Sequence, residues 1–295
     1  MIAAVLTSAP AAGFGQTPSP EAHDKAYWQD IIANDYAPPA DLSLPSLVQE
    51  LSGYLASTDP ALRDEIAYPI LAQWMYVKRI VPLDVRHELV AKWSANLTRG
   101  IGAQGTDSVF LRSFSTLMLS VAVALDNEAP WIEDAEFNRL LHSALTYLRE
   151  ERDTRGFDAE KGWIHSVAHT ADLLKFLGRS RHLEVSGQSA ILTAIAEKLI
   201  QLDHVLIHGE DERLARAVVS ILARPDADMS GFQVLLDGLK PVWPDGLPTP
   251  AQLAVNENRK NLAVSLYAVL NTDGRDLESL HEGAERVLSL LKTMM

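Results

Sequence analysis

Apolar residues recur at helical spacing along the chain from about Ser43 onward, and they almost nowhere alternate with polar residues as they do in strands. Asp59 and Pro60 have the residue types of a helix start, as N-cap and first helical residue. The stripe that follows consists of Leu62, Ile66, Ile70, Trp74 and Val77. Because Pro69 lies inside this stripe, we expect a kink in the helix.

Start and stop signals predict the later helices. Pro82 begins one helix that ends before Gly100, and Thr106 or Asp107 caps a strongly apolar helix that we expect to be buried on most sides. Asp134 begins a further helix after a break at Pro130. The remaining predicted helices lie near residues 163–174, 188–202, 210–223, 230–239, 251–270 and 276–292.

The helix pattern predicts an all-α fold. Helices that open successive pairs begin near residues 60, 107, 163, 210 and 250. This spacing of roughly 40 to 56 residues is typical of HEAT or armadillo hairpins, so we favour an α-solenoid with a concave binding surface. The spacing is irregular and no sequence signature repeats, which leaves a closed helical bundle or an α/α toroid as the alternative.

The absence of linker sequences predicts the domain organisation. No Gly/Ser-rich or long polar linker divides the chain after residue 43, so residues 21–295 are expected to form a single all-helical domain. Residues 1–20 form a leader. Its apolar stretch ends in the small-x-small sequence Ala9-Pro10-Ala11, which is typical of the tail of a signal peptide whose start codon was chosen too late. We therefore expect a periplasmic or secreted protein, with a disordered leader and a cytoplasmic location as the alternative.

Composition removes several classes of function. The 295 residues carry 26 Lys and Arg against 39 Asp and Glu, a formal charge of -13, and no basic run that could neutralise phosphates of nucleic acid. The leader is too short to span a bilayer, so stable membrane insertion is not expected. Without any cysteine, a disulfide, a thiolate metal site and a thiol nucleophile are excluded.

The segment from Gly162 to Leu174 places two histidines and a carboxylate at helical spacing. At about 100° per residue, His165, His169 and Asp172 fall within roughly 60° of arc on one helix face. The opposite face of this expected helix carries Trp163, Val167, Ala171 and Leu174. The polar trio is therefore expected to face water or a groove.

Three interpretations of the trio stay open. The two histidines could bind one divalent metal, with Asp172 as an oxygen ligand and His208 as a further ligand. The zinc-peptidase pattern HExxH would need a glutamate where Ser166 stands, so that peptidase class is not supported. Alternatively His169 pairs with Asp172 in a purely structural role, or the trio lines a metal-free groove for a ligand or peptide. We expect no other cofactor.

A second polar cluster lies about forty residues downstream. His208 precedes the acidic start of the helix near residue 210, where Glu212 and Arg216 are four residues apart. If neighbouring hairpins stack, these side chains could approach the histidine face. The simpler interpretation is that the acidic residues offset the helix dipole and that Glu212 pairs with Arg216.

The segment from Arg155 through Asp158 and the Gly-Trp-x-His-x-x-x-His-x-x-Asp core, together with Gly209 to Ala215, resembles DUF2785, a bacterial family of unknown function. The resemblance implies an all-helical, HEAT-like protein and supplies no catalytic residues. The candidate groove residues are Trp163, His165, His169, Asp172, Asp158, Glu212 and Arg216. We expect an exported helical-repeat protein that binds a protein or peptide partner on its concave face. The alternative is a metal-dependent, hydrolase-like enzyme that uses His165, His169 and Asp172.

Overall fold

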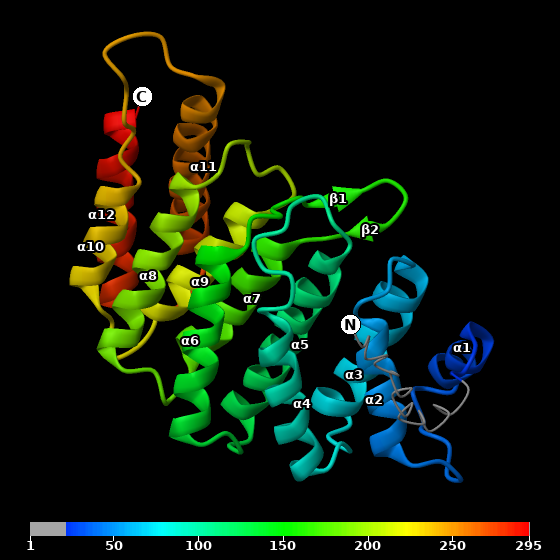
Figure 1. The fold of residues 1–295 in the computed structure, drawn as a ribbon. Helices are drawn as coiled ribbons and strands as arrows, with labels where there is room; N and C mark the ends of the chain where they lie inside the picture. Colours follow the sequence, from blue (N-terminus) through cyan, green and yellow to red (C-terminus); the bar gives the residue numbers. More distant parts are fainter. Residues whose placement is uncertain (1–21, 295) are drawn as a thin grey trace, which may run out of the picture.

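The computed structural model describes residues 22–294, and helices make up nearly all of the regular structure in this range (Figure 1). The predicted all-α class is confirmed. The helices are α1 (Lys25–Ala33), α2 (Leu44–Tyr54), η1 (Ala61–Ala67), α3 (Tyr68–Ala72), η2 (Gln73–Val77), α4 (Leu83–Asn96), α5 (Ser108–Glu128), α6 (Asp134–Glu150), α7 (Ser166–Arg179), α8 (Val185–Ile200), α9 (Glu210–Leu222), α10 (Met229–Gly238), α11 (Pro250–Thr272) and α12 (Glu278–Met294).

The helices form two rows that run side by side (Figure 1). In one row α3 packs against α5, α5 against α7, α7 against α9, and α9 against α11. In the other row α4, α6, α8, α10 and α12 follow one another. Alternate helices of the chain thus share a row, as in helical hairpins. The solenoid, the closed bundle and the toroid differ in how such rows curve, and the solenoid stays a prediction.

Helix α5 lies in the interior, as its apolar sequence predicted. It is the one helix among the described residues that is long and apolar enough to cross a membrane, yet 89% of its most apolar window is buried inside the protein. It packs against α7 of its own row and against α4 of the other row. This helix is therefore a core element, which explains why apolar residues occupy most of its circumference.

The helix predicted from Pro60 to Val77 is interrupted in the structure. The single α-helical turn α3 lies between the π-helical segments η1 and η2, and Pro69 is the second residue of that turn. A π-helical backbone widens the hydrogen-bonded ring, so it accommodates a proline that lacks an N–H group. Val77 was predicted in the buried stripe and is exposed, because the altered helical period moves it off the core face.

A hairpin of two short strands precedes α7, and its second strand includes the predicted start of the histidine helix. Strands β1 (Phe157–Asp158) and β2 (Gly162–Trp163) pair antiparallel, with Phe157 opposite Trp163. Helix α7 begins only at Ser166, after His165. The expectation that Trp163 lies on the buried helix face is wrong, because Trp163 belongs to the hairpin and is 42% exposed.

The leader, residues 1–20, lies outside the described residues. The signal-peptide interpretation and the periplasmic or secreted location that depends on it stay predictions.

Candidate functional site

A buried arginine holds the hairpin against η1. Arg63 is fully buried, and its guanidinium donates hydrogen bonds to the main-chain oxygens of Lys161 at 2.6 Å and Trp163 at 3.2 Å. Gly162 has a φ of +76°, and a Cβ atom there would lie 3.0 Å from Pro60 and 3.1 Å from the Asp64 carboxylate. Glycine therefore permits both the left-handed turn and the close approach of the hairpin to η1.

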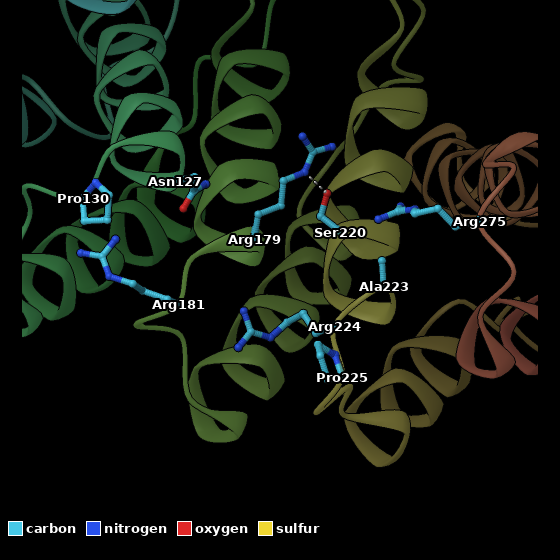
Figure 2. A pocket seen from close by; sticks show the side chains of 9 residues that line it. All are labelled: Asn127, Pro130, Arg179, Arg181, Ser220, Ala223, Arg224, Pro225 and Arg275. Carbon is cyan, nitrogen blue, oxygen red and sulfur yellow. Dashed lines mark hydrogen bonds between the residues drawn. The ribbon is translucent and has the colours of Figure 1, made fainter.

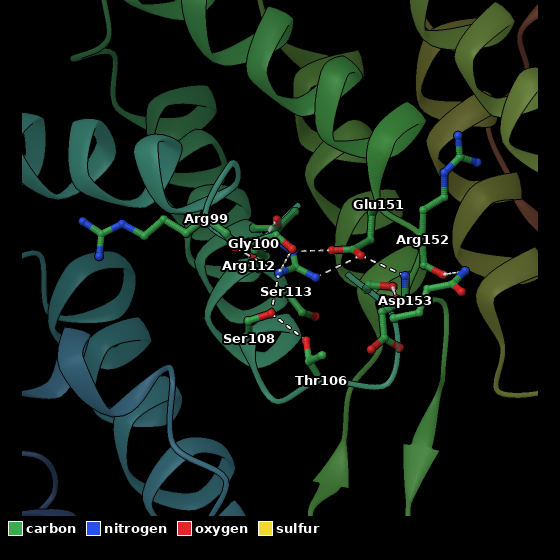
Figure 3. Close-up of polar contacts among 12 residues, drawn as sticks. Arg99, Gly100, Thr106, Ser108, Arg112, Ser113, Glu151, Arg152 and Asp153 are labelled. Carbon is green, nitrogen blue, oxygen red and sulfur yellow. Dashed lines mark hydrogen bonds and ion pairs between the residues drawn. The ribbon is translucent and has the colours of Figure 1, made fainter. Parts of the chain in front are cut away.

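A second buried network fixes the chain that leads to α7 (Figure 3). Arg112 of α5 and Glu151 form an ion pair that is buried on both sides, and the Arg112 guanidinium also donates to two main-chain oxygens after α4. The Ser166 hydroxyl, in the first turn of α7, donates to the main-chain oxygen of Asp153 at 2.6 Å. Residues 151–166 are thus anchored at both ends, which fixes where α7 begins.

His165 occupies the N-cap position of α7 with a left-handed backbone, at φ 50° and ψ 35°. A residue with a Cβ atom adopts this conformation at a cost of roughly 1 kcal/mol. Its ring stacks on the Trp163 indole, with centroids 4.3 Å apart. The side chain is only 6% exposed, and its Nδ1 atom is buried without a hydrogen-bond partner in the described structure. A strained backbone and an unpartnered buried nitrogen coincide at this residue, as they do at binding sites.

The hydrogen bonds of His169 define its tautomer. Its Nδ1 atom lies 2.8 Å from the Ser113 hydroxyl, which donates its own proton to the main-chain oxygen of Ile164. Because Ser113 has only one proton to donate, His169 must be the donor through Nδ1–H. The Nε2 atom then keeps an unprotonated lone pair. His169 is 5% exposed and lines a pocket, so this lone pair is a hydrogen-bond acceptor within the site.

Both imidazoles are neutral at neutral pH. Burial, followed by the positive charge of Arg213, lowers the pKa of His165 from 6.5 to about 4. Burial also lowers the pKa of His169 well below 6.5, and nearby His165 and Arg213 lower it further. Each ring therefore offers one donor and one acceptor instead of a positive charge.

These side chains surround an open pocket of about 470 Å³, which we call the histidine pocket. It lies between η1, α3, α5, α7 and α9, beside the hairpin. Its lining residues are Asp64, Tyr68, Phe114, Leu117, Trp163, His165, His169, Asp172, His208 and Arg213. The structure therefore brings Trp163, both helix histidines, Asp172 and the distant His208 to one place.

The carboxylates of the pocket are already paired. Asp172 contacts Arg213 at 2.5 Å and Lys175 at 3.4 Å, and Asp64 contacts Arg63 at 3.0 Å. The predicted structural pair of His169 with Asp172 is wrong, because Ser113 binds the ring of His169 and Arg213 binds the carboxylate. No sequence spacing indicated these partners, which come from α5 and α9.

The other predicted groove residues lie outside the histidine pocket. Asp158 accepts hydrogen bonds from the main-chain N–H groups of Glu160 and Lys161, both at 2.9 Å, and so stabilises the hairpin turn. Glu212 and Arg216 form an exposed ion pair within α9, as the simpler interpretation of that cluster predicted. Sequence reasoning missed Asp64, Tyr68 and Arg213, since the spacing within one segment carries no signal for residues of other helices.

The metal interpretation has no support in this geometry. Within residues 22–294, no three His, Asp or Glu side chains form a group that could hold a metal ion. Asp172, the expected oxygen ligand, is instead bound by two cations. A metal at His165, His169, Asp172 and His208 stays a prediction.

Comparison with known families identifies the chain at the family level. The sequence model of DUF2785, described as a protein of unknown function, matches residues 97–268, which is more than half of the chain. The chain belongs to the DUF2785 family. The DUF2785 match includes His165, His169, Asp172, His208 and Arg213, whereas the Asp64 and Tyr68 wall of the pocket precedes it. No curated protein and no solved structure matches the chain.

Proposed function

We propose that this DUF2785 protein is a binding protein that receives a peptide partner in the histidine pocket. The observation that carries the proposal is His165, whose buried Nδ1 lacks a partner and whose backbone is held in a left-handed conformation. Burying a polar atom without a hydrogen bond costs about 1 to 3 kcal/mol, which a bound ligand would recover. Strain of this kind persists at ligand-binding sites.

The hydrogen-bonding groups of the histidine pocket that have no partner favour a ligand with an uncharged hydrogen-bond donor. His169 offers the Nε2 lone pair, and the neutral His165 ring offers a second hydrogen-bonding position. Because Arg63 and Arg213 already pair with the two carboxylates, an ionic ligand would find no free counter-charge there. A main-chain amide or an amide or hydroxyl side chain of a peptide supplies N–H or O–H donors without a charge.

The hairpin supplies an apolar contact beside the pocket. Phe157 and Trp163 are both about half exposed and lie edge to face, with ring centroids 4.8 Å apart. Exposed aromatic pairs of this kind are energetically important contacts in interfaces. A peptide can therefore place one polar side chain in the pocket while an adjacent apolar residue packs on this pair. A row of packed helices also offers an extended surface for the rest of the peptide.

Selection from a library of random peptides tests the proposal. Peptides selected on the wild type should lose about tenfold or more in affinity with Trp163→Ala and with His165→Ala. Matched controls are Trp243→Ala and His142→Ala, which change an exposed tryptophan and an exposed histidine away from the pocket. If no peptide is selected on the wild type, or if the selected peptides bind Trp163→Ala as tightly as the wild type, the peptide proposal is wrong.

A further inference from the structure

A second open pocket lies at the other end of α7 and has a different chemistry (Figure 2). We call it the arginine pocket. Its volume is about 380 Å³, and its polar lining consists of Asn127, Arg179, Arg181, Ser220, Arg224 and Arg275. Four guanidinium groups and no carboxylate line this pocket, although the chain as a whole has a formal charge of -13.

Arg224 and Arg181 have structural partners that include a carboxylate each, and Arg224 binds Asp226 at 2.9 Å. Arg224 donates to the main-chain oxygens of Gly178, Ser180 and Leu183, where α7 ends and the next loop begins. Arg181 binds the buried carboxylate of Asp126 at 2.9 Å. These contacts explain the positions of both side chains without any ligand.

Arg179 has no hydrogen-bonded carboxylate partner in the described structure. Its Nε donates to the Ser220 hydroxyl at 3.1 Å, and its guanidinium lies 5.5 Å from the centroid of the Phe176 ring. Both contacts position the group, and within residues 22–294 its Nη1 and Nη2 atoms have no hydrogen-bond partner. The terminal edge of the guanidinium is therefore held in place and free to bind an acceptor.

Arg275, in the loop before α12, contributes a second guanidinium group, and its charge is paired with Asp273. Its guanidinium binds Asp273 through Nε and Nη2, which leaves Nη1 without a partner in the described structure. Burial lowers the pKa of Arg179, and the charge of Arg275 lowers it further, whereas the nearby Asp273 carboxylate raises it.

The pocket also contains an unpartnered acceptor. The amide nitrogen of Asn127 donates to the main-chain oxygen of Phe176 at 2.9 Å, which fixes the orientation of the amide. Its Oδ1 atom is buried and has no partner in the described structure. A ligand that satisfies the whole pocket must therefore carry acceptor oxygens for the guanidinium groups and one donor for Asn127.

We propose that the arginine pocket binds a small phosphate-bearing ligand, with Arg179 and Arg275 on the phosphate oxygens and Asn127 accepting a hydrogen bond from a hydroxyl group elsewhere on the ligand. Planar guanidinium groups match the spacing of phosphate oxygens. The second pKa of a phosphate monoester is about 6, so the dianion predominates at neutral pH and supplies acceptor oxygens to both guanidinium groups. The proposal does not depend on the peptide function of the histidine pocket.

Calorimetric titration with inorganic phosphate at constant ionic strength tests the proposal. We expect saturable binding to the wild type that weakens about tenfold or more in Arg179→Gln, and a similar loss in Arg275→Gln. The matched control is Arg149→Gln, which removes a half-exposed arginine of α6 whose partner is Glu197 at 2.7 Å. Circular dichroism shows that each variant is folded.

Three results would overturn the assignment. Phosphate that gives no saturable heat, or that binds Arg179→Gln as tightly as it binds Arg149→Gln, would leave the arginines with structural roles only. Acetate that binds more tightly than phosphate would replace the phosphate with a carboxylate ligand.

Discussion

The His165 imidazole lies flat against the Trp163 indole, with an angle of only 15° between the two rings. The two residues are separated in the chain by Ile164 alone, and the left-handed backbone of His165 turns its ring back onto the hairpin. Residues two apart on a regular helix point to different sides. The stack therefore depends on the same strained conformation that interrupts the helix predicted from sequence.

The variant with glycine at position 165 is expected to be more stable than the variant with alanine there. His165→Ala and His165→Gly both remove the imidazole, but only glycine adopts a φ of 50° without steric cost. His165→Gly should therefore be more stable than His165→Ala by about 1 kcal/mol in urea unfolding.

The control for this pair is the exposed His142, in the middle of α6. There the order should be reversed, because glycine in a helix interior is about 1 kcal/mol less stable than alanine. The same order at both positions would show that the backbone of His165 is not strained.

Stability is expected to fall as the pH decreases from about 6.5 to about 4. The pKa of His165 is lowered from 6.5 to about 4, and that of His169 is also lowered. The unfolded chain therefore binds more protons in this window than the folded protein, which favours unfolding at lower pH. Each imidazole contributes up to about 1.4 kcal/mol per pH unit.

Denaturant unfolding at several pH values measures this dependence. His169→Gln should flatten the curve, and His142→Gln, which changes an exposed histidine of α6, is the matched control. Identical slopes for the wild type and His169→Gln would contradict the neutral state assigned to His169.

Arg63→Met is expected to destabilise the protein strongly. It removes the donors of two hairpin carbonyl groups and leaves the Asp64 carboxylate without its cation. Removing one partner of a fully buried ion pair costs roughly 3 to 5 kcal/mol, and the partly exposed Asp64 places this pair at or below the lower end of that range. The loss should appear in urea unfolding, together with faster hydrogen exchange of the hairpin amides.

Arg149→Met is the control for Arg63, because an exposed ion pair contributes about 1 kcal/mol or less. If Arg63→Met costs no more than Arg149→Met, the hairpin does not depend on the buried arginine.

Gly156→Ala should displace His208 from the histidine pocket. A Cβ atom at position 156 would overlap the His208 ring and approach the Glu210 carboxylate to 3.0 Å. Overpacking of this kind costs about 1 to 3 kcal/mol. The double variant Gly156→Ala/His208→Ala should recover most of that loss, because the smaller side chain leaves room for the methyl group. Additive losses in the double-mutant cycle would exclude this contact as the cause.

Local patterns predicted much of the helical framework. Helices α6 and α9 begin at Asp134 and Glu210, as predicted, because their start signals and apolar stripes lie within one segment. The pattern gave a wrong prediction at Gly162, where the sequence keeps helical spacing but the backbone forms a hairpin. That outcome depends on Arg63, which is 98 residues from Lys161 in the chain, and no local rule detects such a partner.

The candidate site was predicted in part for the same reason. The spacing of His165, His169 and Asp172 indicated a cluster, and the structure places all three in one pocket. Their hydrogen-bond partners were not predictable, since Ser113 and Arg213 come from helices 56 and 41 residues away in the chain. Those partners determine which side-chain atoms of the pocket remain free to bind a ligand.

Helices α5, α7 and α9 each contribute residues to both pockets, with their first halves at the histidine pocket and their last turns at the arginine pocket. The three helices therefore run parallel, and their peptide dipoles add. The positive ends of the dipoles lie toward neutral imidazoles and aspartates, and the negative ends lie toward four arginines. The three parallel helices therefore give the histidine pocket the positive ends of their dipoles and the arginine pocket the negative ends. The side chains that line each pocket offset that difference.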